Sequence, residues 1–217
     1  YALDVAAACR EQGVQTVAVT AGYIDPAPRE VFFAGVDAAN VDLKAFSERF
    51  YYRVCGGHLQ PVRETLPYIR QEADVWLELT TLLIPGENDS AEEIHAMTNW
   101  VVEHLGPDVP MHFTAFHPDW KMRDTPRTPV ATLSRARDIA LGNGVQHAYT
   151  GNVRDGEGGS TWCHQCGELL IERHRYALGR WGLKADGTCS HCQTPLAGRF
   201  EQAPGLGMQR PVRLRFS

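Results

Sequence analysis

Residues 1 to about 150 alternate between strand-like and helix-like segments, and this alternation constrains the fold more than any other feature of the sequence. Runs rich in β-branched and aromatic residues predict five strands: VQTVAVT (14–20), NVDLK (40–44), VWLELTTLLI (75–84), MHFTAF (111–116) and VQHAYT (145–150). Helical segments separate them, so successive strands are expected to run parallel. We therefore predict an α/β fold whose sheet is either open or closed into a barrel.

Two of the predicted helices have clear signals at their first residues. The segment 91–105 follows Ser90 and carries Glu93, a spacing typical of a capping box. A later helix is expected to begin with Thr128 as its N-cap and Pro129 in the first helical position. Both helices then lead into predicted strands, as βα units require.

Composition and charge exclude several classes of protein. The chain has 217 residues, of which 43% are hydrophobic, so it can bury a sizeable core. Its net charge of -5 provides no overall basic field for nucleic acid. No run approaches the roughly 18 apolar residues of a membrane span. The chain begins at Tyr1 in a helical pattern, and we expect it to be a fragment that starts inside a fold.

The character of the sequence changes near residue 155. Residues 1–155 hold the strand and helix alternation, residues 156–200 hold two cysteine pairs, and residues 201–217 form a tail. In that tail Arg213 and Arg215 alternate with apolar residues, which is typical of an edge strand with one solvated face. We predict three regions with these boundaries, the last being a terminal tail or an edge strand.

Polar residues stand at the carboxyl ends of the predicted strands, where parallel folds gather their chemistry. Asp42 and Lys44 are two residues apart, and hence on one face of a strand. They form either a simple ion pair or a cradle for a charged ligand. Thr80 shares a strand face with Glu78, and His117 follows an apolar strand, where it has either a structural or a ligand-binding role.

Five segments in order resemble the second half of radical S-adenosylmethionine enzymes: VTAGYI, VDLKAF, YYRVCGGHLQPVRETL, VWLELTTLLIPGENDS and FTAFHPD. The resemblance is to the pyruvate formate-lyase activating enzyme group. The TTLLIPGENDS segment and the downstream cysteine pairs resemble more closely the AmmeMemoRadiSam system radical SAM family. This implies the later strands of a partial (β/α) radical SAM barrel. It also implies a [4Fe-4S] cluster that cleaves S-adenosylmethionine to a 5'-deoxyadenosyl radical, which abstracts hydrogen from a peptide or protein substrate.

The resemblance also implies roles for four residues. Asp42 and Lys44 match a D-x-K strand that lies beside the methionine carboxylate, Thr80 matches a polar cofactor contact, and His117 matches a histidine that contacts the ribose. Activating enzymes carry D-T-N-G where this chain has VTAG at 19–22, so we expect no equivalent cation site. No catalytic residue is assigned within the chain.

The cluster motif of these enzymes, C-x3-C-x2-C, does not occur among the six cysteines of the sequence. We therefore expect the cluster ligands to lie upstream of Tyr1 in a parent enzyme, a radical SAM oxidoreductase. The chain as given is expected to bind no catalytic cluster and to be inactive alone. Because nothing in the sequence suggests an oxidising compartment, we expect the protein to be cytoplasmic.

The two CxxC pairs are the most specific local signal in the sequence. Cys163 and Cys166 precede Cys189 and Cys192, with 22 residues between the pairs. Four thiolates at this spacing predict two knuckles converging on one tetrahedral metal ion in a zinc-ribbon-like module. Structural zinc is the favoured ion, and rubredoxin-like iron is the alternative because it uses the same geometry.

The role of this module is open between two interpretations. Basic and aromatic residues interleave between the cysteine pairs, a pattern that also occurs in nucleic-acid modules: Arg173, His174, Arg175, Arg180 and Trp181. The acidic net charge disfavours that interpretation, and docking of a partner protein is preferred. For the whole chain, the alternative to a radical enzyme is a zinc-ribbon βα scaffold that binds a partner protein or nucleic acid without catalysis.

Overall fold

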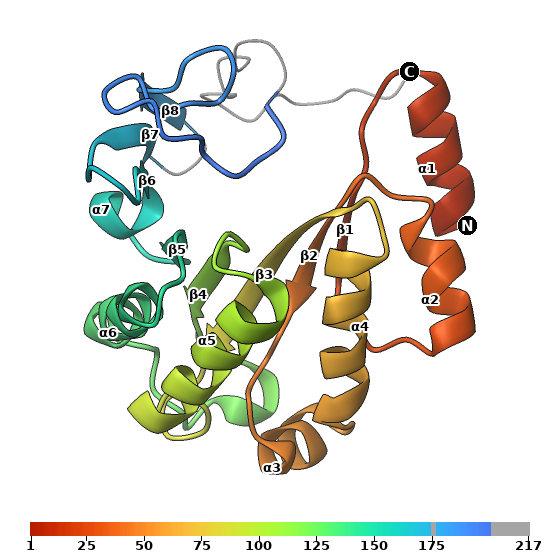
Figure 1. Ribbon diagram of the computed structural model, residues 1–217. Helices are drawn as coiled ribbons and strands as arrows, with labels where there is room; N and C mark the ends of the chain where they lie inside the picture. The colour runs from red at the N-terminus through yellow and green to blue at the C-terminus, as the bar shows by residue number, and fades with distance from the viewer. Residues whose placement is uncertain (175–176, 201–217) are drawn as a thin grey trace, which may run out of the picture. The chain divides into compact units, whose positions relative to one another are not determined.

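A parallel five-stranded sheet organises the first part of the chain (Figure 1). Its strands follow the chain in the order β1-β2-β3-β4-β5, and each neighbouring pair is parallel. The bounds are β1 (Val17–Thr20), β2 (Ala38–Asp42), β3 (Trp76–Leu83), β4 (Met111–Ala115) and β5 (Ala148–Gly151). The predicted α/β fold with a parallel sheet is therefore confirmed, and β1 lies at one edge of the sheet.

The computed structural model describes residues 1–174 and 177–200. The chain divides into two units, one over Tyr1–Val153 and a second from Arg154 onward. The predicted tail at 201–217 and Arg175 lie outside the described residues. Among the helices that the structure describes, none is both long and apolar enough to cross a membrane.

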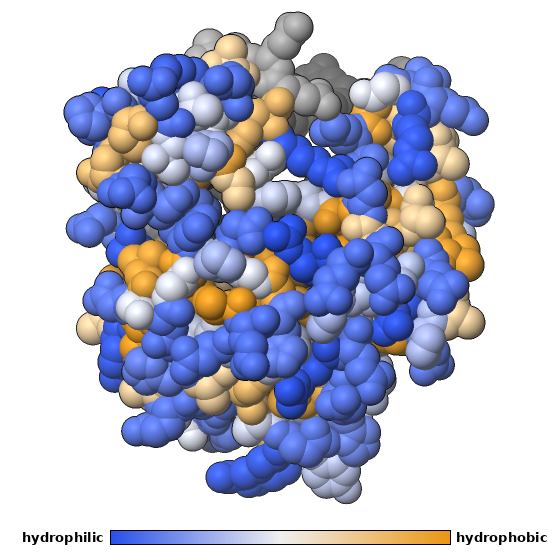
Figure 2. Space-filling view, viewed as in Figure 1, coloured by the Kyte–Doolittle hydropathy of each residue, from blue (hydrophilic) through white to orange (hydrophobic). Residues whose placement is uncertain are grey.

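Helices connect the strands of the first unit in the manner of βα units. They are α1 (Ala2–Glu11), α2 (Pro26–Phe33), α3 (Glu48–Phe50), the π-helix η1 (Tyr51–Cys55), α4 (Leu59–Gln71), α5 (Ala91–Leu105), the 3-10 helix η2 (Trp120–Met122) and α6 (Val130–Gly142). In Figure 1, α4 and α5 lie in front of the strands. Their outward surfaces are mainly hydrophilic in Figure 2, as expected for helices with one buried face.

One face of the sheet forms the core of the first unit. Alternate strand residues are buried against the helices: Ala39, Val41, Leu77, Leu79, Leu83, Met111, Phe113, Ala115 and Ala148. The helices contribute Phe33, Leu66, Ile69, Ile94, Met97, Val101, Leu133 and Ala136 to the same cluster. The opposite side chains of β2 to β5 are only partly buried and mostly polar. A parallel sheet usually buries both faces, so the polar face is the unusual one.

The structure corrects two details of the predicted helix ends. The Ser90 hydroxyl accepts a hydrogen bond from the Glu93 N–H at 3.2 Å, as predicted, but the Glu93 carboxylate accepts from the Phe46 N–H at 2.7 Å instead of completing a capping box. Helix α6 begins one residue later than predicted, with Pro129 as its N-cap. The reason is that the Thr128 hydroxyl is used elsewhere, donating to the Leu83 carbonyl at 2.6 Å.

The strand boundaries also differ by a few residues from the prediction. Strand β2 ends at Asp42, so Lys44 lies just beyond the strand and not within it. The backbone turns there, where the Leu43 N–H donates to the Val41 carbonyl at 3.1 Å. Strand β5 begins at Ala148, three residues later than expected, because the preceding backbone at Gln146 bonds to the Pro107 carbonyl.

The second unit is built on a small antiparallel sheet and a few apolar side chains. Its elements are α7 (Gly156–Gly159), β6 (Thr161–Trp162), β7 (Leu169–His174) and β8 (Ala177–Trp181), with the strand order β6-β7-β8. Among the described residues, its cluster of buried apolar and cysteine side chains consists of Cys163, Leu170, Ile171, Leu183, Cys189 and Leu196. Because this core is small, we do not expect burial of apolar surface alone to keep the unit folded.

Candidate functional site

The polar face is the side of the sheet that the helices leave uncovered. Because side chains alternate along a strand, it carries every second residue of the strands. Its polar members are Asn40 and Asp42 of β2, Glu78 and Thr80 of β3, His112 and Thr114 of β4, and Tyr149 of β5. Asp42, Thr80, His112 and Tyr149 are in register across four neighbouring strands. They therefore form one continuous row of side chains.

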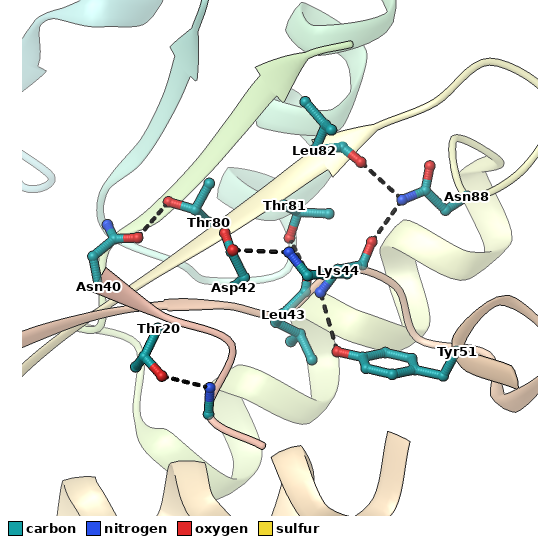
Figure 3. Close-up of polar contacts among 11 residues, drawn as sticks. Thr20, Asn40, Asp42, Leu43, Lys44, Tyr51, Thr80, Thr81, Leu82 and Asn88 are labelled. Carbon is teal, nitrogen blue, oxygen red and sulfur yellow. Dashed lines mark hydrogen bonds and ion pairs between the residues drawn. The ribbon is translucent and has the colours of Figure 1, made fainter. Parts of the chain in front are cut away.

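Asp42 and Lys44 form an ion pair at the carboxyl end of β2 (Figure 3). The Lys44 Nζ lies 2.8 Å from the Asp42 Oδ2. The two side chains remain 39% and 34% exposed, respectively, so both keep access to a ligand. The structure thus shows the ion pair, and the predicted role as a cradle for a charged ligand stays a prediction.

Thr80 lies beside Asp42, its register partner on the neighbouring strand. Its hydroxyl donates a hydrogen bond to the Asn40 Oδ1 at 2.7 Å (Figure 3). Thr81 points to the opposite, buried face, and its hydroxyl donates to the Leu43 carbonyl at 2.8 Å. Successive threonines of β3 therefore serve the two faces of the sheet.

Asn88 fixes the backbone of the segment that carries Lys44. Its side-chain amide donates to the Lys44 carbonyl at 2.6 Å and to the Leu82 carbonyl at 2.9 Å (Figure 3). Its Oδ1 accepts from the Ile84 N–H at 2.7 Å. The residue is fully buried. It ties the segment that follows β2 to the end of β3, so the position of Lys44 depends on it.

Tyr51 supports the same segment from the π-helix. Its hydroxyl accepts a hydrogen bond from the Lys44 N–H at 3.2 Å. Burial raises the pKa of Tyr51 above its ordinary value, since the charged phenolate is disfavoured away from water. The phenol is therefore neutral at physiological pH and available as a hydrogen-bond partner.

His117 lies just beyond strand β4, which ends at Ala115. It is exposed, and its Nδ1 lies 3.0 Å from the carbonyl oxygen of the adjacent Pro118. Lys44 is bonded to Asp42, and the register of β2 and β3 places Thr80 beside Asp42. No hydrogen bond among the described residues joins His117 to these three side chains. Its predicted contact with a ribose stays a prediction.

The structure adds a polar cluster that the sequence reasoning did not assign. The His112 Nε2 lies 2.7 Å from the Glu78 Oε2, and the Trp76 indole N–H donates to the Glu78 Oε1 at 3.0 Å. The His112 ring stacks on Tyr149, with ring centroids 5.0 Å apart and planes at 25°. The two-residue alternation of MHFTAF places His112 on the polar face, and this signal could have identified it.

The four predicted metal ligands come together in the second unit. Their sulfur atoms all lie within 4.8 Å of one another, with Cys163 to Cys192 at 3.6 Å and Cys166 to Cys189 at 3.8 Å. Four sulfurs bound tetrahedrally at about 2.3 Å are about 3.8 Å apart, so these distances fit a metal ion at their centre. This is the one such group of His, Cys, Asp and Glu side chains in the part of the chain that the structure describes.

The two cysteine pairs share one backbone design. Gly167 follows the first pair and Gln193 the second, with positive φ angles of 73° and 64°. In each loop the N–H of this residue donates to the carbonyl of the first cysteine at 2.9 Å. The N–H of Cys163 likewise donates to Glu168 and that of Cys189 to Thr194. Two matching knuckles present the four sulfurs to a common centre.

Thr194 favours the thiolate form of one predicted metal ligand, Cys192. Hydrogen bonds from its hydroxyl and its backbone N–H lower the pKa of Cys192 to about 6. The thiolate is the form that binds metal, so Cys192 offers a ligand at neutral pH without first having to lose a proton.

Carboxylates accompany the basic residues of the second unit. Arg180 pairs with Glu168 and donates its backbone N–H to the Glu172 Oε2 at 2.9 Å, and His174 pairs with Glu172 at 3.0 Å. Arg173 donates to the Thr161 hydroxyl at 2.6 Å. The Glu168 and Glu172 carboxylates offset part of the positive charge that would attract phosphate groups, while the choice between a nucleic acid and a partner protein stays a prediction.

Comparison with known proteins gives two relationships. No family model matches the chain. It is 39% identical over 174 residues to the uncharacterized protein MJ0808 of Methanocaldococcus jannaschii, an alignment that covers 80% of this chain and 51% of that protein. The chain thus spans about half the length of this curated relative.

A solved structure is similar to the fold described above. It is a domain of pyruvate-formate lyase-activating enzyme from Bacteroides vulgatus, with a TM-score of 0.60 and 15% sequence identity, and the match covers 69% of this chain and 89% of that one. At this identity the likeness shows the fold alone. It agrees with the α/β fold predicted from the sequence, whereas the narrower AmmeMemoRadiSam resemblance stays a prediction.

Proposed function

We propose that the chain is the later part of a radical S-adenosylmethionine enzyme of the activating type, acting on a peptide or protein. The observation that carries this proposal is the Asp42–Lys44 pair, which lies beside Thr80 on the polar face of a fold similar to an activating-enzyme domain. Polar groups at the carboxyl ends of parallel strands are where ligands bind in such folds.

The charged pair has the capacity to hold the amino-acid part of S-adenosylmethionine. An ammonium has three N–H donors and a carboxylate about four acceptor positions, and the contact at 2.8 Å uses one of each. Lys44 would bind the ligand's carboxylate and Asp42 its ammonium, while Thr80 and His117 would contact the rest. With a reduced [4Fe-4S] cluster, this cofactor supplies a radical that removes hydrogen from a substrate.

In our proposal, a strand from an upstream segment of the protein pairs with β1 at the edge of the sheet. Val17 and Val19 of β1 are 64% and 79% exposed, and the structure pairs this strand with β2 alone among the described residues. Apolar side chains on an unpaired edge are a liability unless something covers them. In our proposal the upstream part of the protein supplies both this cover and the cluster ligands, as the greater length of the relative permits.

The four-cysteine site would hold zinc in a structural role. An all-sulfur tetrahedral set suits zinc or iron, and its closed geometry has no open position for a substrate. The small core of the unit gives the ion a structural task. We propose that the module docks a partner protein, and that the whole protein works in the cytoplasm, where thiols stay reduced.

Equilibrium binding of S-adenosylmethionine tests the proposal. The longer protein that contains this chain would be reconstituted anaerobically, and the dissociation constant measured by calorimetry. Lys44→Met should weaken binding by roughly tenfold or more, because a charge-assisted hydrogen bond is lost. Arg10→Met is the matched control, since Arg10 pairs with Asp37 in another part of the unit. Equal affinities of the two variants would refute the assigned role of Lys44.

A further inference from the structure

The imidazole of His112 is fixed in orientation by residues from both neighbouring strands. From β3, Glu78 holds its Nε2 at 2.7 Å, and from β5, Tyr149 stacks on its ring face with centroids 5.0 Å apart. Glu78 is itself held by the Trp76 indole at 3.0 Å. A side chain secured on two sides presents its remaining polar atom in a defined place.

Because the partner of the His112 ring is the Glu78 carboxylate, the geometry indicates which ring nitrogen of His112 carries the proton. An indole N–H is a donor only, so the Glu78 Oε1 accepts from Trp76, and the Glu78 carboxylate likewise accepts from the His112 Nε2. In neutral imidazole the proton on Nε2 leaves Nδ1 with an unshared electron pair. No hydrogen bond from the described residues reaches this Nδ1. Among the described residues, Nδ1 is therefore a hydrogen-bond acceptor of fixed orientation that has no donor.

The location of His112 relates this acceptor to the candidate cofactor residues. His112 is the register partner of Thr80 on the neighbouring strand, and Thr80 is the register partner of Asp42. Neighbouring strands lie about 4.8 Å apart, so His112 is about 10 Å from the proposed ligand of the ammonium group. Its side chain is 29% exposed, which leaves room for contact. A molecule bound beside the cofactor would meet it.

We propose that His112 binds the substrate and accepts at Nδ1 a hydrogen bond from one of its amide N–H or hydroxyl groups. Glu78 and Tyr149 are positioning residues that act through His112. The inference rests on the proposed function, which places the cofactor on the same row of side chains.

Nitrogen NMR of the labelled chain tests the first step. The expected spectrum shows the neutral His112 ring with its proton on Nε2 and with Nδ1 unprotonated. Glu78→Gln should shift the balance between the two tautomers, because an amide can also donate to the ring. A proton on Nδ1 in the unaltered protein would overturn the inference, since no acceptor would then remain.

Titration with small probes tests the contact itself. N-acetylglycine N-methylamide supplies amide N–H groups, ethylene glycol supplies hydroxyls, and N-acetylsarcosine dimethylamide supplies neither. We expect saturable shifts of the Nδ1 signal with at least one of the first two, and roughly fivefold weaker binding of the third. Which of the two probes binds identifies the donor as an amide or a hydroxyl. His104→Ala is the matched control, because His104 also stacks on an aromatic ring but lies on helix α5, and it should leave these affinities unchanged.

The outcomes separate this inference from the proposed function. Equal responses to all three probes would refute the role of His112 even if the longer protein binds S-adenosylmethionine. Discrimination among the probes in a protein that fails to bind S-adenosylmethionine would support the substrate contact and reject the radical enzyme. Loss of discrimination in His112→Ala, with an unchanged melting temperature, would complete the support.

Discussion

At the scale of single residues, the buried side chain of Asn88 determines where the charged pair sits. Its amide satisfies the carbonyls of Lys44 and Leu82 and the N–H of Ile84. A buried backbone group that loses its partner costs about 1–3 kcal/mol. The apparently ordinary loop segment PGEND is therefore the anchor of the candidate site.

Substitution of Asn88 by alanine should destabilise the protein by about 2–4 kcal/mol, because three backbone groups lose partners at once. Urea unfolding followed by circular dichroism measures the change. Gln60→Ala is the control, since Gln60 is an exposed helical residue that donates to the Glu64 carboxylate, and its loss should cost no more than about 0.5 kcal/mol. A change for Asn88→Ala as small as for the control would contradict the account.

Tyr51 predicts a pH dependence of stability. Its folded-state pKa is raised by burial, so the folded protein retains a proton that the unfolded chain releases near pH 10. The free energy of unfolding should have its full Tyr51 contribution below about pH 10 and lose it as pH rises further. Unfolding of the wild type and of Tyr51→Phe, compared between pH 8 and 11, measures this. Parallel pH profiles would show that Tyr51 plays no such part.

At the scale of elements, the parallel sheet could be predicted from the alternation of segments, whereas the order of its strands comes from the structure. The ends of elements could not, because long-range partners compete for the same side chains. Thr128 has the sequence of an N-cap, yet its hydroxyl bridges the Leu83 carbonyl and the Phe116 N–H. Glu93 has the sequence of a capping box, yet it bonds to Phe46. His112 was not predicted because it lies inside β4, whereas the rule for parallel sheets points to residues at the carboxyl ends of strands.

Thr128 should therefore contribute to the joint between β3 and β4. Thr128→Val keeps the shape but removes both hydrogen bonds, and it should cost about 1–3 kcal/mol, whereas Thr128→Ser should restore most of the loss. Thermal unfolding of the two variants gives the comparison. If valine and serine behave alike, the hydroxyl has no bracing role.

At the scale of the whole molecule, the two units are expected to depend on metal differently. The first unit has an extensive apolar core, whereas the described part of the second unit has a cluster of six buried apolar or cysteine residues. Removal of the ion with a chelator should unfold only the second unit. Limited proteolysis should then cut beyond Arg154 and spare the preceding residues.

Two variants sharpen this metal test. Cys189→Ser removes one of the four ligands, whereas Ser190→Ala changes the adjacent residue of the same knuckle and should retain the metal. Elemental analysis of the purified proteins should find about one zinc per wild-type chain. Iron in place of zinc would revise the identity of the ion, and proteolytic resistance that survives chelation would contradict its structural role.

The central claim, that this fold belongs to an enzyme generating an organic radical from S-adenosylmethionine, has one direct test. The longer protein containing the chain would be reconstituted with iron and sulfide under anaerobic conditions, reduced, and incubated with S-adenosylmethionine. We predict release of 5'-deoxyadenosine and methionine, detected by mass spectrometry. An intact cofactor in the presence of a loaded and reduced cluster would contradict the claim.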